Sequence, residues 1–226
     1  FGVGLKAGAT YKLTGRHFIT ANAAFINRPP AANVSYLSPR IRDEVIPGLT
    51  KETVISGDIG YILRAPRLKV RATLYYTRMA DQVWNRSYYH DEFLTLVNYS
   101  MTGVDQVHRG VEIGAEANLT STWVATMVYA GGNYTYDSRP TATLTRNNST
   151  EQYGDRVIYW KGYRVGGMPQ SAASLGLKYN SPKFWFAGFN ANWFGDIYLD
   201  PNPDRRTAEA VENLVTSDPQ WNDLLD

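Results

Sequence analysis

The chain has 226 residues, of which 13% are aromatic, including 16 Tyr and 6 Trp, and it also contains 19 Gly. Its formal net charge is only +2 and its Lys and Arg residues are dispersed, so no basic patch predicts a nucleic-acid partner. The absence of Cys excludes disulfides and thiol chemistry, and no apolar run reaches the ~18–20 residues of a membrane-spanning helix. A β-rich protein, soluble or embedded in a membrane as a barrel, remains open.

Eight segments of the chain alternate between polar and apolar residues with a period of two, the pattern of β-strands whose two faces meet different surroundings. In chain order, these predicted strands span about residues 1–13, 17–27, 52–64, 67–79, 107–119, 122–136, 170–180 and 183–198. In segment 107–119, for example, Glu112 and Glu116 share one face and aliphatic side chains occupy the other. The first predicted strand begins at Phe1, so we expect the sequence to be a processed or partial piece of a longer one.

The predicted connections between these strands fall into two classes that alternate along the chain. Tight turns lie at 14–16, at 65–66, near 121 and at 181–182, and long polar segments lie at 28–51, 80–106, 137–169 and 199–226. Each long segment greatly exceeds the usual connection of about 4–6 residues. Successive hairpins therefore have tight turns at one end and long connections at the other. The last long segment has helical spacing at 208–214.

This arrangement is typical of an antiparallel transmembrane β-barrel of the all-β class, with short periplasmic turns, long extracellular loops and apolar faces toward lipid. Trp185 and Trp193 are separated by ~19 Å in depth if the strand is tilted by about 45°, so we assign both to the membrane girdle. A soluble β-sandwich is the alternative, but it has no reason to lengthen every second connection.

The polar faces of the predicted strands are expected to line the lumen of the barrel. Six residues represent these faces: Lys69, Arg71, Glu112, Glu116, Asn190 and Asn192. A closed barrel of about eight strands has an interior that side chains just fill. The charged and small residues found here suit a wider lumen, either water-filled or plugged, and the predicted strands would then be one sector of a larger barrel.

Four stretches of the sequence occur in the order in which similar stretches are found in TonB-dependent outer-membrane receptors. They are GLTKETVISGDIGY (48–61), RATLYYTRMADQVW (71–84), NYSMTGVDQVHRGVEIGAEANLT (98–120) and PQSAASLGLKYNSPKFWFAGFNANWFGDIYLD (169–200). The chain resembles the barrel of this family, although Lys51 stands where the family usually has Pro. The resemblance implies that residues 1–226 are a partial barrel domain, a sector of a 22-stranded barrel without the plug domain and the final strands.

The resemblance also implies a location in the outer membrane of a Gram-negative bacterium and a role in TonB-dependent active uptake of a large nutrient. Iron chelates, glycans, peptides and vitamins are all candidate substrates. The implied partners are outer-membrane lipid, a TonB-type energy-coupling protein that acts through the absent plug, and a surface-exposed substrate-binding lipoprotein; no cofactor is implied. A passive porin, a small adhesin-like barrel and a soluble carbohydrate-binding β-sandwich remain alternatives.

No combination of residues in the sequence predicts an enzyme or a metal site. His17, His90 and His108 are scattered and lack the spacing of metal ligands. Glu112 and Glu116 are ~13 Å apart along a strand, too far to act together as a glycosidase pair. We therefore expect no catalytic residue and assign both glutamates to the wall of the barrel.

The predicted outer loops contain aromatic and hydrogen-bonding residues that suit a sugar, peptide or chelate ligand, because loops on a rigid scaffold often carry binding sites. In VWNRSYYHDEF (83–93) the candidate ligand-binding residues are Trp84, Tyr88, Tyr89, His90, Asp91 and Glu92. In EQYGDRVIYWKGYR (151–164) they are Tyr159 and Trp160. The alternative is that these aromatic residues pack the loops together or belong to the membrane girdle.

Overall fold

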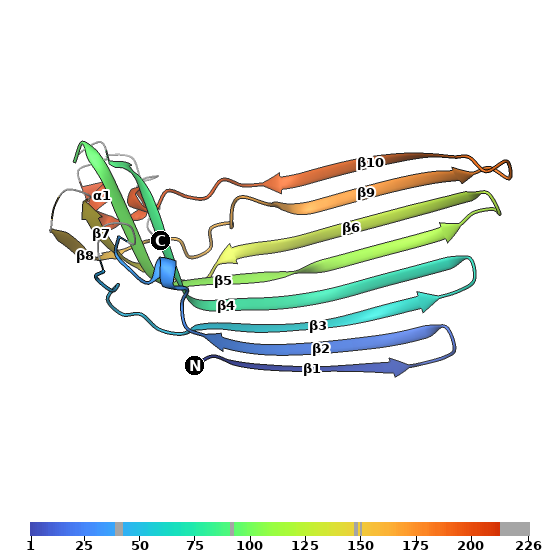
Figure 1. Cartoon of the computed structure of the whole chain (residues 1–226), viewed down its shortest axis with the longest axis horizontal. Coiled ribbons are helices and arrows are strands. Elements are labelled where there is room, and N and C mark those ends of the chain that lie inside the picture. Colours follow the sequence, from blue (N-terminus) through green and yellow to red (C-terminus); the bar gives the residue numbers. More distant parts are fainter. Residues whose placement is uncertain (39–42, 91–92, 147–148, 150, 213–226) are drawn as a thin grey trace.

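The computed structural model describes residues 1–38, 43–90, 93–146, 149 and 151–212, and its strands form one long, curved sheet (Figure 1). The strands are β1 (Val3–Lys12), β2 (His17–Arg28), β3 (Glu52–Arg64), β4 (Leu68–His90), β5 (Thr95–Asn118), β6 (Trp123–Tyr136), β7 (Thr141–Arg146), β8 (Gln152–Val157), β9 (Pro169–Asn180) and β10 (Phe186–Ile197). The short helices are η1 (Ala32–Val34), η2 (Asp204–Arg206) and α1 (Ala208–Glu212).

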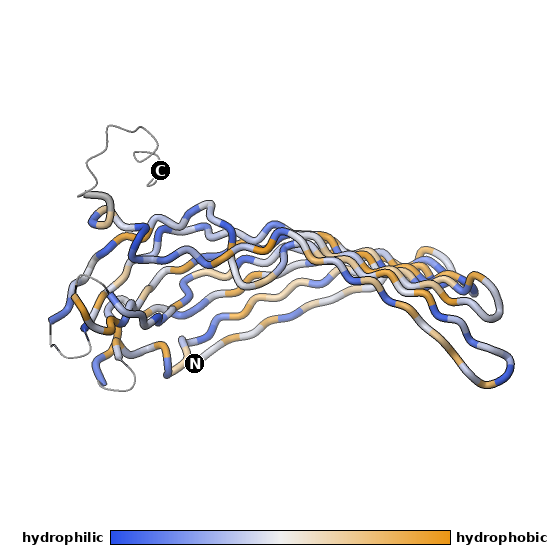
Figure 2. The backbone as a smooth tube through the Cα atoms, turned by 90° about the horizontal axis from the view of Figure 1, so that it is seen from above, coloured by the Kyte–Doolittle hydropathy of each residue, from blue (hydrophilic) through white to orange (hydrophobic). Residues whose placement is uncertain are grey.

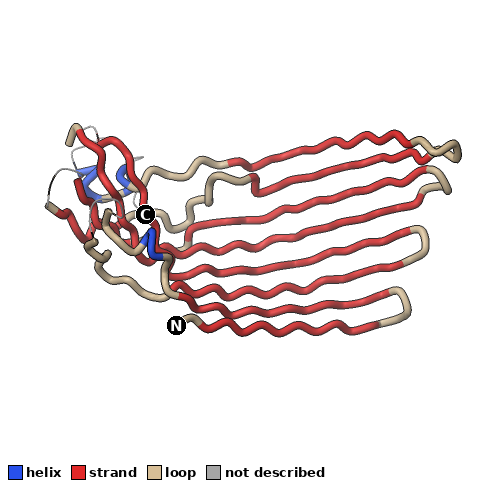
Figure 3. The backbone as a smooth tube through the Cα atoms, viewed as in Figure 1, coloured by secondary structure: helices blue, strands red, loops and turns tan. Residues whose placement is uncertain are grey.

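The ten strands belong to a single antiparallel sheet in the order β1-β2-β3-β4-β5-β6-β9-β10, with β7 paired to β5 and β8 paired to β7. The all-β antiparallel class predicted from the sequence is confirmed, and every predicted strand is present (Figure 3). Within the described residues, β1 and β10 are edge strands that do not pair with each other, so the sheet is open. An open, curved sheet agrees with a sector of a barrel.

Tight turns close the hairpins at one end of the sheet, where the sequence predicts them (Figure 1). Each turn is fixed by a backbone hydrogen bond of 2.8–2.9 Å, donated by Leu13 to His17, by Ala65 to Leu68, by Leu119 to Trp123 and by Ser181 to Trp185. The long connections all lie at the opposite end (Figure 3). The predicted asymmetry between the two ends of the hairpins is therefore present.

The strand register gathers apolar side chains on one face of the sheet. One cross-strand row joins Tyr11, Ile19, Tyr61, Ala72, Ile113, Tyr129, Ala173 and Trp193. Figure 2 shows hydrophobic and hydrophilic residues following one another along the strands. Many large apolar side chains on this face are exposed, for example Leu74 at 60% and Phe189 at 70%. No described residue of the chain packs over them as a second layer.

The structure differs from the sequence prediction in segment 80–106, which was expected to be an irregular loop. β4 continues to His90 and β5 begins at Thr95, so most of this segment is a long hairpin. Two register shifts lie between Met79 and Trp84, close to Asp81 and Gly103, whose φ angles are +58° and +72°. Such bulges insert a residue and reverse the alternation of faces, which explains why a strict period of two ended at residue 79.

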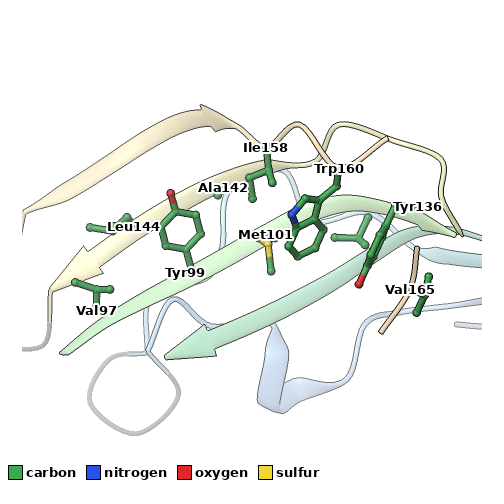
Figure 4. Packing of buried hydrophobic residues seen from close by; sticks show 10 residues of the cluster. Val97, Tyr99, Met101, Tyr136, Ala142, Leu144, Ile158, Trp160 and Val165 are labelled. Atoms are coloured by element: carbon green, nitrogen blue, oxygen red, sulfur yellow. The ribbon is translucent and has the colours of Figure 1, made fainter. Parts of the chain in front are cut away.

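The buried core of the described chain lies at these bulges and beyond them, away from the tight turns. Its main cluster consists of Val97, Tyr99, Met101, Val104, Tyr136, Ala142, Leu144, Ile158, Trp160 and Val165 (Figure 4). A second, smaller cluster contains Leu37, Ile46 and Val83.

We call the described residues within 34–49, 80–106, 134–167 and 198–212 the outer region, and the remaining parts of the strands the strand wall. α1 confirms the described part of the helix predicted at 208–214; residues 213 and 214 lie outside the described residues.

Candidate functional site

The main cluster of the outer region lies on the same side of the sheet as the polar face of the strand wall. Tyr136 pairs with Gln106, and residues 106, 108, 110 and 112 of β5 share one face because side chains alternate along a strand. Glu112 therefore lies on the same face as Tyr136. The ring of Trp160 packs on Tyr136 with a centroid distance of 4.7 Å, so segment 158–165 covers this face.

Segments 34–38 and 43–46 cover the opposite face of the long hairpin. The Asn85 side chain donates a hydrogen bond of 2.9 Å to the Tyr36 carbonyl, and the Asn98 amide donates to Ser38 Oγ at 3.3 Å. Ser100 Oγ donates to the Leu37 carbonyl at 3.4 Å. The outer region is thus a small folded unit in which two layers of chain enclose the extended hairpin.

Two aspartates fasten the segment after β10 to this hairpin. Asp200 accepts from Arg86 Nη2 at 2.9 Å, from the Tyr136 hydroxyl at 3.3 Å and from the Gly166 amide at 3.1 Å. The Arg86 guanidinium in turn lies over the ring of Trp84, with its carbon 5.1 Å from the ring centroid. This first anchor joins residues 114 positions apart in the sequence.

Asp204 is the second anchor, and it meets three side chains of the hairpin and β8. His90 Nε2 is 3.2 Å from its Oδ2 atom, and the Tyr99 hydroxyl and Arg156 Nη1 are 3.3 Å and 3.5 Å from Oδ1. Burial is the main cause that raises the pKa of Tyr99 and of neighbouring Tyr88 above the ordinary value of 10, and the charge of Asp204 raises both further. Tyr99 is therefore protonated at neutral pH and can donate to Asp204.

Four of the candidate ligand-binding residues pack inside the outer region. Trp160 is fully buried, and Trp84 contacts it edge-on with a centroid distance of 6.1 Å. Tyr88 packs on Tyr99 at 5.7 Å, and His90, only 9% exposed, stacks on the Phe93 ring. This geometry favours the packing interpretation of these aromatic side chains over direct contact with a ligand.

The other candidate ligand-binding residues lie elsewhere. Tyr89 is 56% exposed, and because it follows Tyr88 along the strand it points to the opposite face of the hairpin. Tyr159 is partly buried, and the Arg139 guanidinium carbon lies 4.8 Å from its ring centroid. Asp91 and Glu92 lie outside the described residues. The structure therefore does not bring the six described candidates together around one pocket.

A pocket of about 660 Å³ lies between segments 161–164 and 198–206. Its lining includes Lys161, Tyr163, Arg164, Tyr198 and Arg206. None of these five residues is among the candidate ligand-binding residues, although Lys161, Tyr163 and Arg164 belong to the stretch EQYGDRVIYWKGYR (151–164), where Tyr159 and Trp160 are the candidates. The second half of the lining comes from a segment distant in the sequence, and no local pattern connects the two.

The six residues expected to line the lumen all lie on the polar face of the strand wall. Lys69 pairs with Glu116, and their side chains form a salt bridge of 2.8 Å. The same cross-strand row leads through β6 and β9 to Asn190, and the adjacent row joins Arg71 to Asn192. Glu112 occupies a third row on this face, opposite Thr73. A hollow of about 850 Å³ near the tight turns includes Lys69, Arg71 and Glu116 in its lining.

The two girdle candidates lie on the apolar side of the sheet. Trp193 pairs with Ala173 in the apolar row that also contains Tyr61, and it is 54% exposed. Trp185, 53% exposed, lies at the turn before β10, where its ring is 5.2 Å from that of Tyr179. The two tryptophans thus mark two different heights of the sheet.

The described residues contain no group of three or more His, Asp or Glu side chains that could hold a metal ion. Among them, no helix has both the length and the apolar character needed to cross a membrane. The chemistry available in the pocket and on the polar face is that of charge, hydrogen bonding and aromatic contact.

Comparison with known proteins connects this geometry to a family. The model of the family described as "TonB dependent receptor-like, beta-barrel" matches residues 5–221. Among solved structures, the chain is similar to the ferric-catecholate import receptor Fiu of E. coli K12 in its closed form, with 18% identity and a TM-score of 0.44. That match covers 77% of this chain and 28% of the receptor chain, so the chain spans just over a quarter of its length. Comparison with curated proteins finds no match.

Proposed function

The chain belongs to the TonB-dependent receptor-like β-barrel family, and we propose that it forms part of the wall and the ligand-capturing mouth of an active uptake receptor for a large nutrient. It is an outer-membrane protein of a Gram-negative bacterium. The observation that carries the proposal is the match of the family's barrel to residues 5–221. Because this is a family of receptors, we also propose that the chain is not an enzyme.

The two faces of the strand wall support a definite orientation in the membrane. Moving exposed apolar side chains such as Leu74 from water into apolar surroundings stabilises the protein by about 25 cal/mol per Å² of apolar surface. The apolar face would therefore contact lipid. Charged groups such as Lys69 and Arg71 are disfavoured next to lipid and would face the lumen with Glu112, Glu116, Asn190 and Asn192. Trp185 and Trp193 would then belong to the membrane girdle.

The position of the outer region supports a role in capture. Its main cluster lies on the polar-face side of the hairpin, so segments 158–167 and 198–207 would extend over the entrance to the lumen. A folded unit held by Asp200 and Asp204 can present a pocket of fixed shape, whereas an irregular loop would lose more conformational entropy on binding.

The partners of the receptor follow from the same proposal. Outer-membrane lipid would surround the apolar face, and a TonB-type energy-coupling protein would act through a plug domain in the lumen. A surface-exposed lipoprotein that hands over the substrate is a further proposed partner. The substrate remains one of the classes considered from the sequence: an iron chelate, a glycan, a peptide or a vitamin.

Uptake in cells with and without a functional TonB system tests the proposal. We would express the full-length protein in a Gram-negative host and measure the uptake of labelled chelates, glycans, peptides and vitamins in matched strains. Active uptake predicts accumulation of one substrate class that is lost when TonB is deleted. Equal passage of small, unrelated solutes in both strains would instead support a passive porin.

A further inference from the structure

We propose that the pocket between segments 161–164 and 198–206 binds an anionic ligand that presents carboxylate or phosphate groups and an apolar or planar portion. The pocket lies in segments that pack on the polar-face side of the long hairpin, at the mouth of the lumen. Naming this ligand as the transported substrate depends on the proposed uptake function. Binding of the anion to the pocket does not depend on it.

The charge of the lining supports an anion. Lys161, Arg164 and Arg206 all line the pocket, and within the described part of the chain none of them forms a salt bridge with a carboxylate. The carboxylate in the lining is Asp200, which is already paired with Arg86 at 2.9 Å. The pocket therefore contains three cationic groups whose charge is not balanced by the described residues around them.

Two of these cations are held in place before a ligand arrives. Arg164 Nη1 donates to Gln170 Oε1 at 3.2 Å, and its guanidinium carbon lies 5.9 Å from the Tyr198 ring centroid. The Arg206 guanidinium lies 4.7 Å from the ring centroid of Tyr163. An arginine held in this way loses less side-chain entropy on binding and can still offer its fork of donors to a carboxylate or phosphate.

The backbone brings the two segments closer together than most residues would allow. A Cβ atom on Gly166 would lie 2.3 Å from the Asp200 amide nitrogen, so only glycine fits there. The Gly166 amide donates to Asp200, and the Gly167 amide donates to the Tyr198 carbonyl at 3.0 Å. The pocket is consequently a built feature of the fold, fixed by backbone contacts on both sides.

The size and the aromatic lining indicate more than a simple ion. About 660 Å³ lies within the range of roughly 300–1,000 Å³ that is usual for small-molecule pockets. Tyr198 is 37% exposed and Tyr163 is partly exposed, so both can contact an apolar or planar part of the ligand. A neutral sugar could use the tyrosines, but it would leave the three cationic groups without a counter-charge.

Calorimetry on the purified full-length protein in non-ionic detergent tests this inference. The probes are benzene-1,3,5-tricarboxylate, its neutral trimethyl ester, and citrate, which carries the charge without the ring. We expect the tricarboxylate to bind most tightly, citrate more weakly and the ester not at all. The affinity for the tricarboxylate should also fall as the salt concentration rises, because the interaction is between exposed charges.

Substitutions separate this pocket from other basic sites. Lys161→Gln, Arg164→Gln and Arg206→Gln should each weaken tricarboxylate binding about tenfold, as expected for the loss of one charge-assisted contact. The matched control is Arg139→Gln, which removes an exposed cation of the same region that lies over Tyr159 outside the pocket and should leave binding unchanged. Near-ultraviolet circular dichroism of each variant checks that the outer region is folded.

The outcomes distinguish the anion site from the uptake function. Equal binding of the ester and the tricarboxylate, or equal loss of affinity in Arg139→Gln and in the pocket variants, would overturn the anion site. So would the absence of tricarboxylate binding to the folded protein, even if uptake in cells depends on TonB. Specific binding combined with TonB-independent uptake would retain the anion site and overturn the transport role.

Discussion

The strand wall and the outer region share two strands, β4 and β5, yet apolar side chains are exposed in the wall and buried in the outer region. In the wall part of β4, Leu74 is 60% exposed, whereas in the outer part of β5, Met101 is fully buried. The wall is a single layer of sheet, and in the outer region two further segments of chain cover the strands. The difference fits the proposed orientation, in which lipid around the wall would take the place of a protein core, whereas the outer region, in water, needs a core of its own.

The largest expected effect comes from removing the largest fully buried side chain of the outer region. Trp160→Ala leaves a cavity next to Tyr136 and Met101 and should destabilise the outer region by about 3–5 kcal/mol. Trp193→Ala, in the wall, is the matched control and should cost far less, because its side chain is 54% exposed. Hydrogen exchange of the detergent-solubilised protein measures both. Equal loss of protection in the two variants would contradict the comparison.

A second prediction compares adjacent residues on the two faces of the wall. Val111 shares the apolar row of Leu74, and Glu112 lies on the polar face. Val111→Arg should cost about 2–4 kcal/mol, because it places a charge against lipid, while Glu112→Arg should stay within about 0.5 kcal/mol. Folding into lipid vesicles, followed by urea titration, measures both changes. A larger cost for Glu112→Arg would reverse the assignment of the faces.

A third prediction concerns the anchor at Asp204. Asp204→Asn removes the charge that accepts hydrogen bonds from Tyr99 and interacts with His90 and Arg156, and we expect a loss of about 2 kcal/mol, localised to segment 198–207. The wall variant Asp58→Asn serves as the control, since Asp58 accepts a single exposed hydrogen bond from Asn22. Limited proteolysis should cleave segment 198–207 faster in the first variant only. Unchanged cleavage would show that Asp204 is not an anchor.

The smallest effect is a loss of stability at alkaline pH that should be confined to the outer region. The pKa of Tyr99 is raised in the folded state by burial and by Asp204, so its contribution to stability is complete below pH 10 and decreases as pH rises above the unfolded value of 10. Each such tyrosine contributes about 1.4 kcal/mol per pH unit in that window. Tyr99→Phe should reduce the slope of stability against pH. An unchanged slope would mean that Tyr99 ionises freely in the folded protein.

The strands of the wall could be predicted from the sequence because each has one face toward the exterior and one toward the lumen. The predicted strand 52–64 coincides with β3, and 17–27 differs from β2 by one residue. The alternation of polar and apolar residues is interrupted where Asp81 and Gly103 form bulges. The strand β7 was not predicted, because it is only six residues long and mostly buried. Short strands with two buried faces lack the polar and apolar alternation on which the prediction relied.

The site was less predictable than the fold because burial in the outer region depends on distant partners. Trp84 and Trp160 were identified as candidates for contact with a ligand, but their contacts with Tyr136 are long-range and place them in a packed core. The pocket joins Tyr163 and Arg206, and no local pattern connects the two residues. A residue's chemistry is visible in the sequence, whereas its accessibility is decided by the segment that covers it.

The sequence by itself determined the hairpin order, the ends with short turns and long connections, and the two faces of the wall, because a strand whose two faces meet different surroundings must alternate with a period of two. Only the tertiary structure decided which aromatic side chains are buried and where three cations meet. Those outcomes depend on contacts such as that of Arg86 with Asp200, which are set when the chain folds back on itself.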